Sequence, residues 1–170
     1  MKACLLLGSN LGDRKALLAN ALMCIERDIG TVVSVSQIYE TEPWGFKADT
    51  PFLNQALLID TMLSPLCLLE RCQYIESELG RRKAEPARTA GTSDATETNK
   101  AYASRTIDID ILFYEEVVCE TSELTLPHPR LHHRTFALKP LAEVAPEWHH
   151  PVLGLTAEGF LALLEMKSLP

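Results

Sequence analysis

Apolar positions along the chain divide it into strand-like runs and stretches with helical spacing. Short runs rich in Val, Ile and Leu predict strands over residues 2–7, 31–39, 52–62 and 106–114. Apolar residues three and four apart predict amphipathic helices over residues 13–29 and 65–80. The second helix has Pro65 in its first turn, and each helix is ended by a glycine, Gly30 or Gly80. The predicted order is therefore βαββαβ.

This order predicts an α+β protein with a ferredoxin-like core, in which helices cover one face of a mainly antiparallel sheet. A C-terminal extension follows, with a short strand at residues 117–119 and helices at residues 131–141 and 156–164. Residues 84–104 lack periodicity, and we expect them to form a mobile loop. No linker divides the sequence, so we expect a single domain over residues 1–170.

The composition is that of an ordinary globular protein, with 46% hydrophobic and 23% charged residues. No apolar run approaches the ~20 residues that cross a bilayer, and no export signal precedes the first strand, so we expect a cytoplasmic protein. A formal net charge of −7 argues against broad nucleic-acid binding, because phosphate backbones require a basic face. Residues 81–105 form a basic segment in this acidic protein, because they contain six cationic and three acidic side chains. A phosphate ligand would bind near this segment.

Two carboxylates stand two residues apart in the last strand of the predicted core. Residues two apart in a strand share a face, so Asp108 and Asp110 lie together, opposite the apolar face of Ile107, Ile109 and Ile111. On a central strand, as expected here, neighbouring carboxylates require compensation by cations or hydrogen-bond donors. Magnesium often binds one or two carboxylates together with substrate phosphates. The simpler alternative is the solvated face of an edge strand, which is common for Asp-x-Asp alone.

Cationic side chains near this strand favour the metal interpretation. Arg105 opens the strand, and His128 and Arg130 follow it after a short connection. Arg can hold phosphate oxygens in a bidentate manner, and His can donate to a phosphate or leaving oxygen. These groups are the ones that phosphoryl transfer needs beside magnesium.

Two other patterns carry less weight. Residues 8–12 contain two glycines but lack the lysine of a phosphate-binding loop, so they are interpreted as a tight turn from strand to helix. The pairs His132-His133 and His149-His150 lack the ligand spacing of a zinc site. They are interpreted as surface histidines.

Six short motifs follow one another along nearly the whole chain. They are Leu7-Gly-Ser-Asn-Leu-Gly-Asp13, Tyr39-Glu-Thr-Glu-Pro-Trp-Gly45, Phe52-Leu-Asn54, Ile75-Glu76 with Gly80-Arg81, Arg105-Thr-Ile-Asp-Ile-Asp-Ile-Leu112, and Leu126-Pro-His-Pro-Arg130 with Arg134-x-Phe136. Single motifs are weakly specific, whereas their order and spacing are highly specific. Taken in this order, they resemble the 6-hydroxymethyl-7,8-dihydropterin pyrophosphokinase family.

The resemblance implies transfer of the β,γ-diphosphate of ATP to the hydroxymethyl group of a reduced pterin, giving AMP and the pterin diphosphate of folate synthesis. Two Mg2+ ions would be held by Asp108 and Asp110. The implied catalytic residues are Asp108, Asp110, Arg81 and Arg105. ATP-binding residues carried over from the family are Gln73, Glu76, Lys83, Arg105, Ile111, Thr125, His128, Arg130 and Arg134. The implied pterin-binding residues are Thr41, Pro43, Trp44, Phe52, Asn54, Asp108 and Phe136, with Phe52 and Phe136 on either side of the ring.

The sequence departs from the family pattern in the segment before the last strand, which is long and offers only Tyr102 as an aromatic residue. Glu123 stands where some members carry an arginine. Two alternatives stay open: a ferredoxin-like module that binds a small ligand without turnover, and a metal-dependent phosphohydrolase. The family suggests a monomer, while the net charge and the absence of a long apolar run argue against nucleic acid and membrane as partners.

Overall fold

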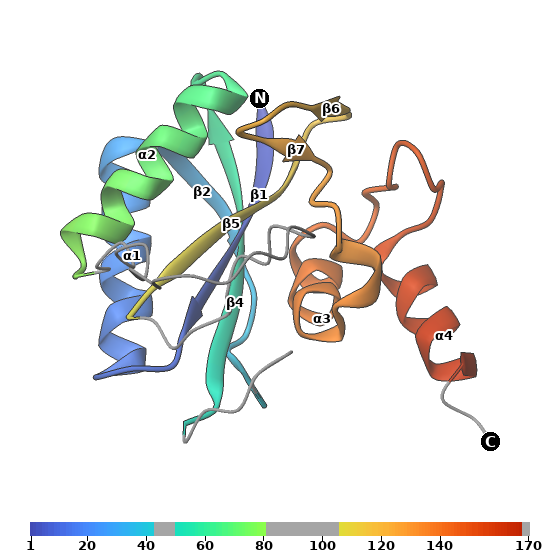
Figure 1. Cartoon of the computed structure of the whole chain (residues 1–170), viewed down its shortest axis with the longest axis horizontal. Coiled ribbons are helices and arrows are strands. Elements are labelled where there is room, and N and C mark those ends of the chain that lie inside the picture. The colour runs from blue at the N-terminus through green and yellow to red at the C-terminus, as the bar shows by residue number, and fades with distance from the viewer. Residues whose placement is uncertain (43–49, 81–105, 168–170) are drawn as a thin grey trace, which may run out of the picture.

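The computed structural model describes residues 1–42, 50–80 and 106–167. Most predicted elements are present with bounds shifted by a few residues (Figure 1). The elements are β1 (Lys2–Ser9), α1 (Arg14–Asp28), β2 (Gly30–Val35), β3 (Tyr39–Thr41), β4 (Phe52–Thr61), α2 (Pro65–Glu78), β5 (Asp108–Tyr114), β6 (Cys119–Glu120), β7 (Thr125–Leu126), a 3-10 helix (Leu131–His133), α3 (Thr135–Val144) and α4 (Ala157–Lys167).

The main sheet has the strand order β2-β4-β1-β5, and every neighbouring pair is antiparallel. This arrangement confirms the ferredoxin-like prediction. The strand predicted over residues 31–39 is broken in two, because the chain leaves β4 after Val35 and returns to it at β3. At the break, Ser36 exchanges hydrogen bonds with the main chain of Ala56: its N–H donates to the carbonyl, and its Oγ accepts from the N–H.

The two core helices cover one face of the sheet, as predicted, and the C-terminal extension covers part of the other. The helices α1 and α2 pack on the first face, where alternate β1 residues Ala3, Leu5 and Leu7 are buried. The C-terminal extension covers part of the second face, with α3 against the sheet and α4 outside it (Figure 1). There, Cys4 and Leu6 contribute to a second apolar cluster. Strand β1 is therefore buried from both sides along most of its length.

The helix predicted over residues 131–141 is two helices. A 3-10 turn ends at His133, and α3 begins at Thr135, so Arg134 lies between them with extended backbone. Because this residue is outside both helices, its side chain can turn toward the sheet. None of the helices in the described ranges is long and apolar enough to cross a membrane.

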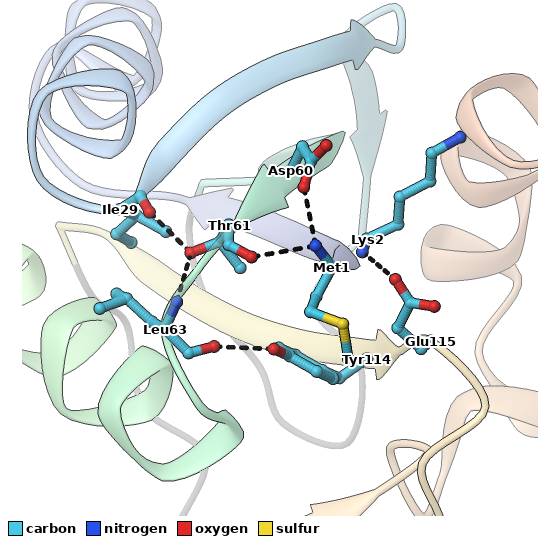
Figure 2. A network of polar contacts seen from close by, with 8 residues as sticks. All are labelled: Met1, Lys2, Ile29, Asp60, Thr61, Leu63, Tyr114 and Glu115. Carbon is cyan, nitrogen blue, oxygen red and sulfur yellow. Dashed lines mark hydrogen bonds and ion pairs between the residues drawn. The ribbon is translucent and has the colours of Figure 1, made fainter.

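Hydrogen bonds tie the ends of β4 and β5 to Ile29, after α1, and to Leu63, before α2, where β1 begins (Figure 2). The buried Thr61 hydroxyl donates to the Ile29 carbonyl at 2.7 Å and accepts from the Leu63 N–H at 3.2 Å. The Tyr114 hydroxyl donates to the Leu63 carbonyl at 2.8 Å. At the same end, the N–H of Lys2 donates to a carboxylate oxygen of Glu115. This end of the sheet is fixed by polar contacts that do not involve the predicted site.

Candidate active site

Polar residues replace the apolar cluster on the second face toward the end of β1. In cross-strand register, Gly8 of β1 lies between Asn54 of β4 and Asp108 of β5. The preceding row holds Leu6, with Ala56 on one side and Asp110 on the other. The carboxylate pair and the predicted pterin-edge residue therefore share one surface.

Gly8 leaves a gap in this surface. A Cβ placed on Gly8 would lie 3.4 Å from Asn54 Oδ1, 3.8 Å from Phe52 Cδ1 and 4.0 Å from Asp108 Cβ. A side chain in the middle of a strand normally fills such a space, and a glycine there marks close approach by another group. The missing side chain thus lets a flat ligand approach the backbone between an amide, an aromatic ring and a carboxylate.

The walls of this gap are tied to neighbouring elements. Asn54 is buried, and its amide nitrogen donates to Thr41 Oγ1 of β3 at 2.8 Å. That bond fixes the orientation of the amide, so its Oδ1 faces Gly8. Phe52 is half-buried at the start of β4, and Phe136 is half-buried in the first turn of α3.

A cationic cluster adjoins the carboxylates. Arg134 is 6% exposed, and its Nη1 lies 3.5 Å from Asp110 Oδ2 and 3.3 Å from His128 Nε2. Its guanidinium carbon also lies 5.5 Å from the ring centroid of Phe136. A buried guanidinium needs a nearby anion, and Asp110 supplies one. The contact to Phe136 brings the predicted ring-binding residue beside the predicted phosphate-binding residue.

His128 is held in its neutral form. Burial, followed by the charge of Arg134, lowers the pKa of His128 to about 4. The Arg130 N–H lies 3.2 Å from Nδ1, and Arg134 Nη1 lies 3.3 Å from Nε2, so each ring nitrogen faces a donor. A neutral ring accepts at one of these nitrogens and carries its proton on the other. The Arg134 guanidinium beside the ring can donate to an oxygen of an anionic ligand.

The other predicted ATP-binding residues lie in different environments. Gln73 is exposed on α2, Thr125 is half-buried in β7, and Arg130 is exposed after the β7 segment. The Ile111 side chain is 5% exposed and packs in the first core, so only its main chain could meet a ligand. Glu76 is buried, and its Oε1 accepts the Ile109 N–H at 2.8 Å. The structure thus brings together Asp110, His128 and Arg134 from this part of the prediction.

Five predicted site residues fall outside the described ranges, as does the predicted loop at residues 84–104. They are Pro43, Trp44, Arg81, Lys83 and Arg105. Among the described residues, no group of three or more His, Cys, Asp or Glu side chains could hold a metal ion. Asp108 and Asp110 are a two-carboxylate set, which suits an ion whose other ligands come from a bound phosphate.

Two expectations about individual side chains are wrong. In the described sheet β5 is an edge strand, paired with β1 alone, so the Asp pair is not on a central strand. His150 is not a surface histidine: it is 7% exposed, and its Nδ1 lies 3.3 Å from the N–H groups of both Val152 and Leu153. His132 is half-buried, whereas His133 and His149 are exposed as expected.

Gly8 was not among the residues predicted for the site, although its position carried a signal. Its place at the end of an otherwise apolar strand was interpreted only as the start of a turn. In the structure it is still within β1, and its missing side chain opens the surface between Asn54 and Asp108.

Comparisons with known proteins agree with this geometry. The family described as 7,8-dihydro-6-hydroxymethylpterin-pyrophosphokinase (HPPK) matches residues 4–146. The chain belongs to this family. It is 42% identical to the 2-amino-4-hydroxy-6-hydroxymethyldihydropteridine pyrophosphokinase of Porphyromonas gingivalis, over 85% of this chain and 90% of that protein. It is 40% identical to the protein of the same name from Bacillus subtilis, over 83% of this chain and 76% of that protein.

Solved structures confirm the fold of this HPPK family member. A Plasmodium falciparum HPPK-DHPS crystal structure matches 98% of the chain with a TM-score of 0.69 and 18% identity. The chain spans 44% of that longer protein.

Proposed function

We propose that the chain transfers the β,γ-diphosphate of ATP to the hydroxymethyl group of 6-hydroxymethyl-7,8-dihydropterin, giving AMP and the pterin diphosphate in folate biosynthesis. Family membership supports this reaction. One structural observation carries it in this chain: Asp108 borders the gap above Gly8, and the neighbouring Asp110 borders the cluster of His128 and Arg134. A ring site and an anion site therefore meet at one pair of carboxylates.

The pterin would lie against the gap above Gly8. The Asn54 amide, held by Thr41, presents its oxygen to hydrogen-bond donors on the edge of the ring. Phe52 lies at the margin of the gap and offers an aromatic surface for stacking. Phe136, Pro43 and Trp44 are proposed to complete this site. A ring in this position places its hydroxymethyl group toward Asp108.

Asp108 and Asp110 are proposed to hold two magnesium ions. The donor set fits, because hard carboxylate oxygens are shared with phosphate oxygens in typical magnesium sites. When bound, magnesium supplies charge neutralisation on the phosphates and lowers the pKa of the attacking hydroxyl. Asp110 also faces Arg134, so the carboxylate that would hold a metal also compensates a buried cation.

The phosphate chain of ATP, the co-substrate, would be held by the cationic cluster. The guanidinium of Arg134 can donate to its oxygens, and the neutral ring of His128 lies beside it. A guanidinium remains charged throughout the reaction and can follow negative charge as it moves between oxygens. Arg81 and Arg105 are proposed to act on the same phosphates.

The decisive experiment measures AMP formation from ATP. We expect AMP only when Mg2+ and 6-hydroxymethyl-7,8-dihydropterin are both present. Asp110→Ala should lose turnover and remain folded, whereas Asp60→Ala, at the other end of the sheet, is a matched control that should retain it. ATP hydrolysis without pterin would favour a phosphohydrolase, and ligand binding without AMP would favour a non-catalytic module. Full activity in Asp110→Ala would contradict the proposed metal site.

Finer features of the proposal concern the state of the protein. We expect a monomeric, cytoplasmic enzyme made of one domain, acting on small molecules without nucleic acid or membrane. Light scattering with and without ligands tests the monomer. A stable dimer would contradict that expectation and leave the proposed reaction intact.

A further inference from the structure

Glu76 is a buried carboxylate among apolar side chains of α2. It lies on α2 at 6% exposure, on the apolar stripe that also buries Leu68, Cys72 and Ile75. Burial of an ionisable side chain is costly unless it makes strong hydrogen bonds. Its Oε1 accepts the main-chain N–H of Ile109 at 2.8 Å. This contact joins α2 to the middle of the Asp108–Ile109–Asp110 segment.

The contact falls on the side of β5 that has no partner strand among the described residues. Within the described residues β5 pairs only with β1, so its outer edge has no neighbouring strand. Edge strands expose main-chain groups that have no partner in a neighbouring strand. The Glu76 carboxylate accepts one such N–H, and the residue that donates it lies between the two carboxylates.

We propose that Glu76 is a positioning residue, which fixes both metal-binding carboxylates at once through the Ile109 amide. The inference rests on the proposed function of Asp108 and Asp110. It differs from the role that the family resemblance assigns to Glu76, which is contact with ATP. A backbone shift at Ile109 would move the neighbouring side chains on both sides. Metal sites require ligand placement within about 0.5 Å.

The proposal requires a hydrogen-bond acceptor at residue 76 and no negative charge. Glu76→Gln keeps an oxygen at the same reach, and Glu76→Ala removes it. A residue that contacts ATP or metal through its charge would be impaired by both substitutions. Glu78→Ala is the matched control, because Glu78 is on the same helix but is exposed and pairs with Arg27 of α1 at 3.1 Å.

Two measurements on the full chain test the proposal. Amide exchange of Ile109, followed by NMR without ligands, should accelerate about tenfold in Glu76→Ala and stay near the wild-type rate in Glu76→Gln. Binding of Mn2+ in the presence of ATP, followed by electron paramagnetic resonance, should weaken about 10- to 100-fold in Glu76→Ala and change little in Glu76→Gln. Turnover should follow metal binding in each variant, and Glu78→Ala should match the wild type.

Several results would overturn the proposal. Equal loss of Mn2+ binding in Glu76→Gln and Glu76→Ala would show that the charge matters, and unchanged Ile109 exchange in Glu76→Ala would show that the contact is not a constraint. If Glu76→Ala does not fold, Glu76→Gln decides: wild-type exchange and metal binding support positioning, and weakened metal binding refutes it. Failure of the wild type to make AMP would contradict the proposed reaction, while Ile109 exchange would still test the positioning.

Discussion

Replacing Gly8 by alanine should separate stability from activity in this protein. The backbone of Gly8 is in a strand and outside the left-handed region, so alanine can adopt it. The new methyl group would meet Asn54 Oδ1 at 3.4 Å and other atoms at 3.8 Å or more, which is tight at one point and ordinary elsewhere. Gly→Ala at a compatible site stabilises by about 0.4–1 kcal/mol through the unfolded chain. The expected result is an unchanged or slightly raised melting temperature.

The same methyl group should obstruct the pterin. It stands ~1.5 Å above Cα, the length of a carbon–carbon bond, so a ring lying against Gly8 would be displaced by a similar distance. Misplacement of a reacting group by about 1 Å can cost about 100-fold in rate. We therefore expect kcat/KM for the pterin to fall by roughly 10- to 100-fold, with little change in ATP affinity.

The assay combines thermal unfolding, calorimetric titration with pterin and AMP formation. Gly30→Ala is a matched control with the opposite expectation: its Cβ would lie 2.2 Å from the Asp60 carbonyl oxygen, so it should destabilise by about 1–3 kcal/mol and leave the pterin site intact. Wild-type pterin affinity and turnover in Gly8→Ala would refute the argument that the gap above Gly8 is ligand space. If Gly8→Ala did not fold, this would contradict the conclusion that a methyl group fits at Gly8 without a severe clash.

Two further predictions concern His128 and the opposite end of the sheet. Since its pKa is lowered from 6.5 to about 4, stability linked to His128 should be fully present above pH 6.5 and be lost as pH falls toward 4; NMR titration should place its pKa well below 6.5. Arg134→Gln should raise that pKa, and a histidine that titrates normally in the wild type would contradict the buried cluster. Thr61→Val should destabilise by about 1–3 kcal/mol in urea unfolding, because the Ile29 carbonyl and the Leu63 N–H lose their partner, while turnover of the folded fraction stays normal. If Thr61→Val turned over more slowly than the wild type under conditions where it is fully folded, this end of the sheet would be coupled to the proposed site.

Local sequence patterns predicted the helices and strands of the core well, because burial of one face makes apolar residues recur at regular intervals along each of them. Alternation in β5 predicted that Asp108 and Asp110 share a face, with Ile109 on the other, and the burial of Ile109 in the first core confirms it. The break after Val35 was not predicted, since residues 32–39 are rich in Val and Ile and contain no glycine or proline. The position of β5 at the edge depends on pairing between distant strands, which periodicity does not report.

Single polar residues on apolar stripes were the least predictable features. Glu76 follows Cys72 by four residues, so its place on the buried stripe of α2 was visible in the spacing, but its partner, a main-chain N–H of β5, was not. His150 gave no periodic signal, because it lies in a turn and is buried through tertiary packing. Arg134 was expected inside a helix, and only the break between the 3-10 turn and α3 explains how it reaches Asp110.

The second face of the sheet shows why a strand pattern cannot by itself distinguish a core from a site. Near the start of β1 this face is apolar and covered, with Cys4 and Leu6 in the cluster beneath α3. Two residues beyond Leu6, the same face holds Gly8, flanked by Asn54 and Asp108. Alternation assigns all these residues to one face, but coverage changes along the strand because α3 packs on only part of it. The site therefore lies where α3 no longer covers the second face of the sheet. The apolar residues beneath α3 are packed, and they hold the neighbouring polar residues of the same strands in place.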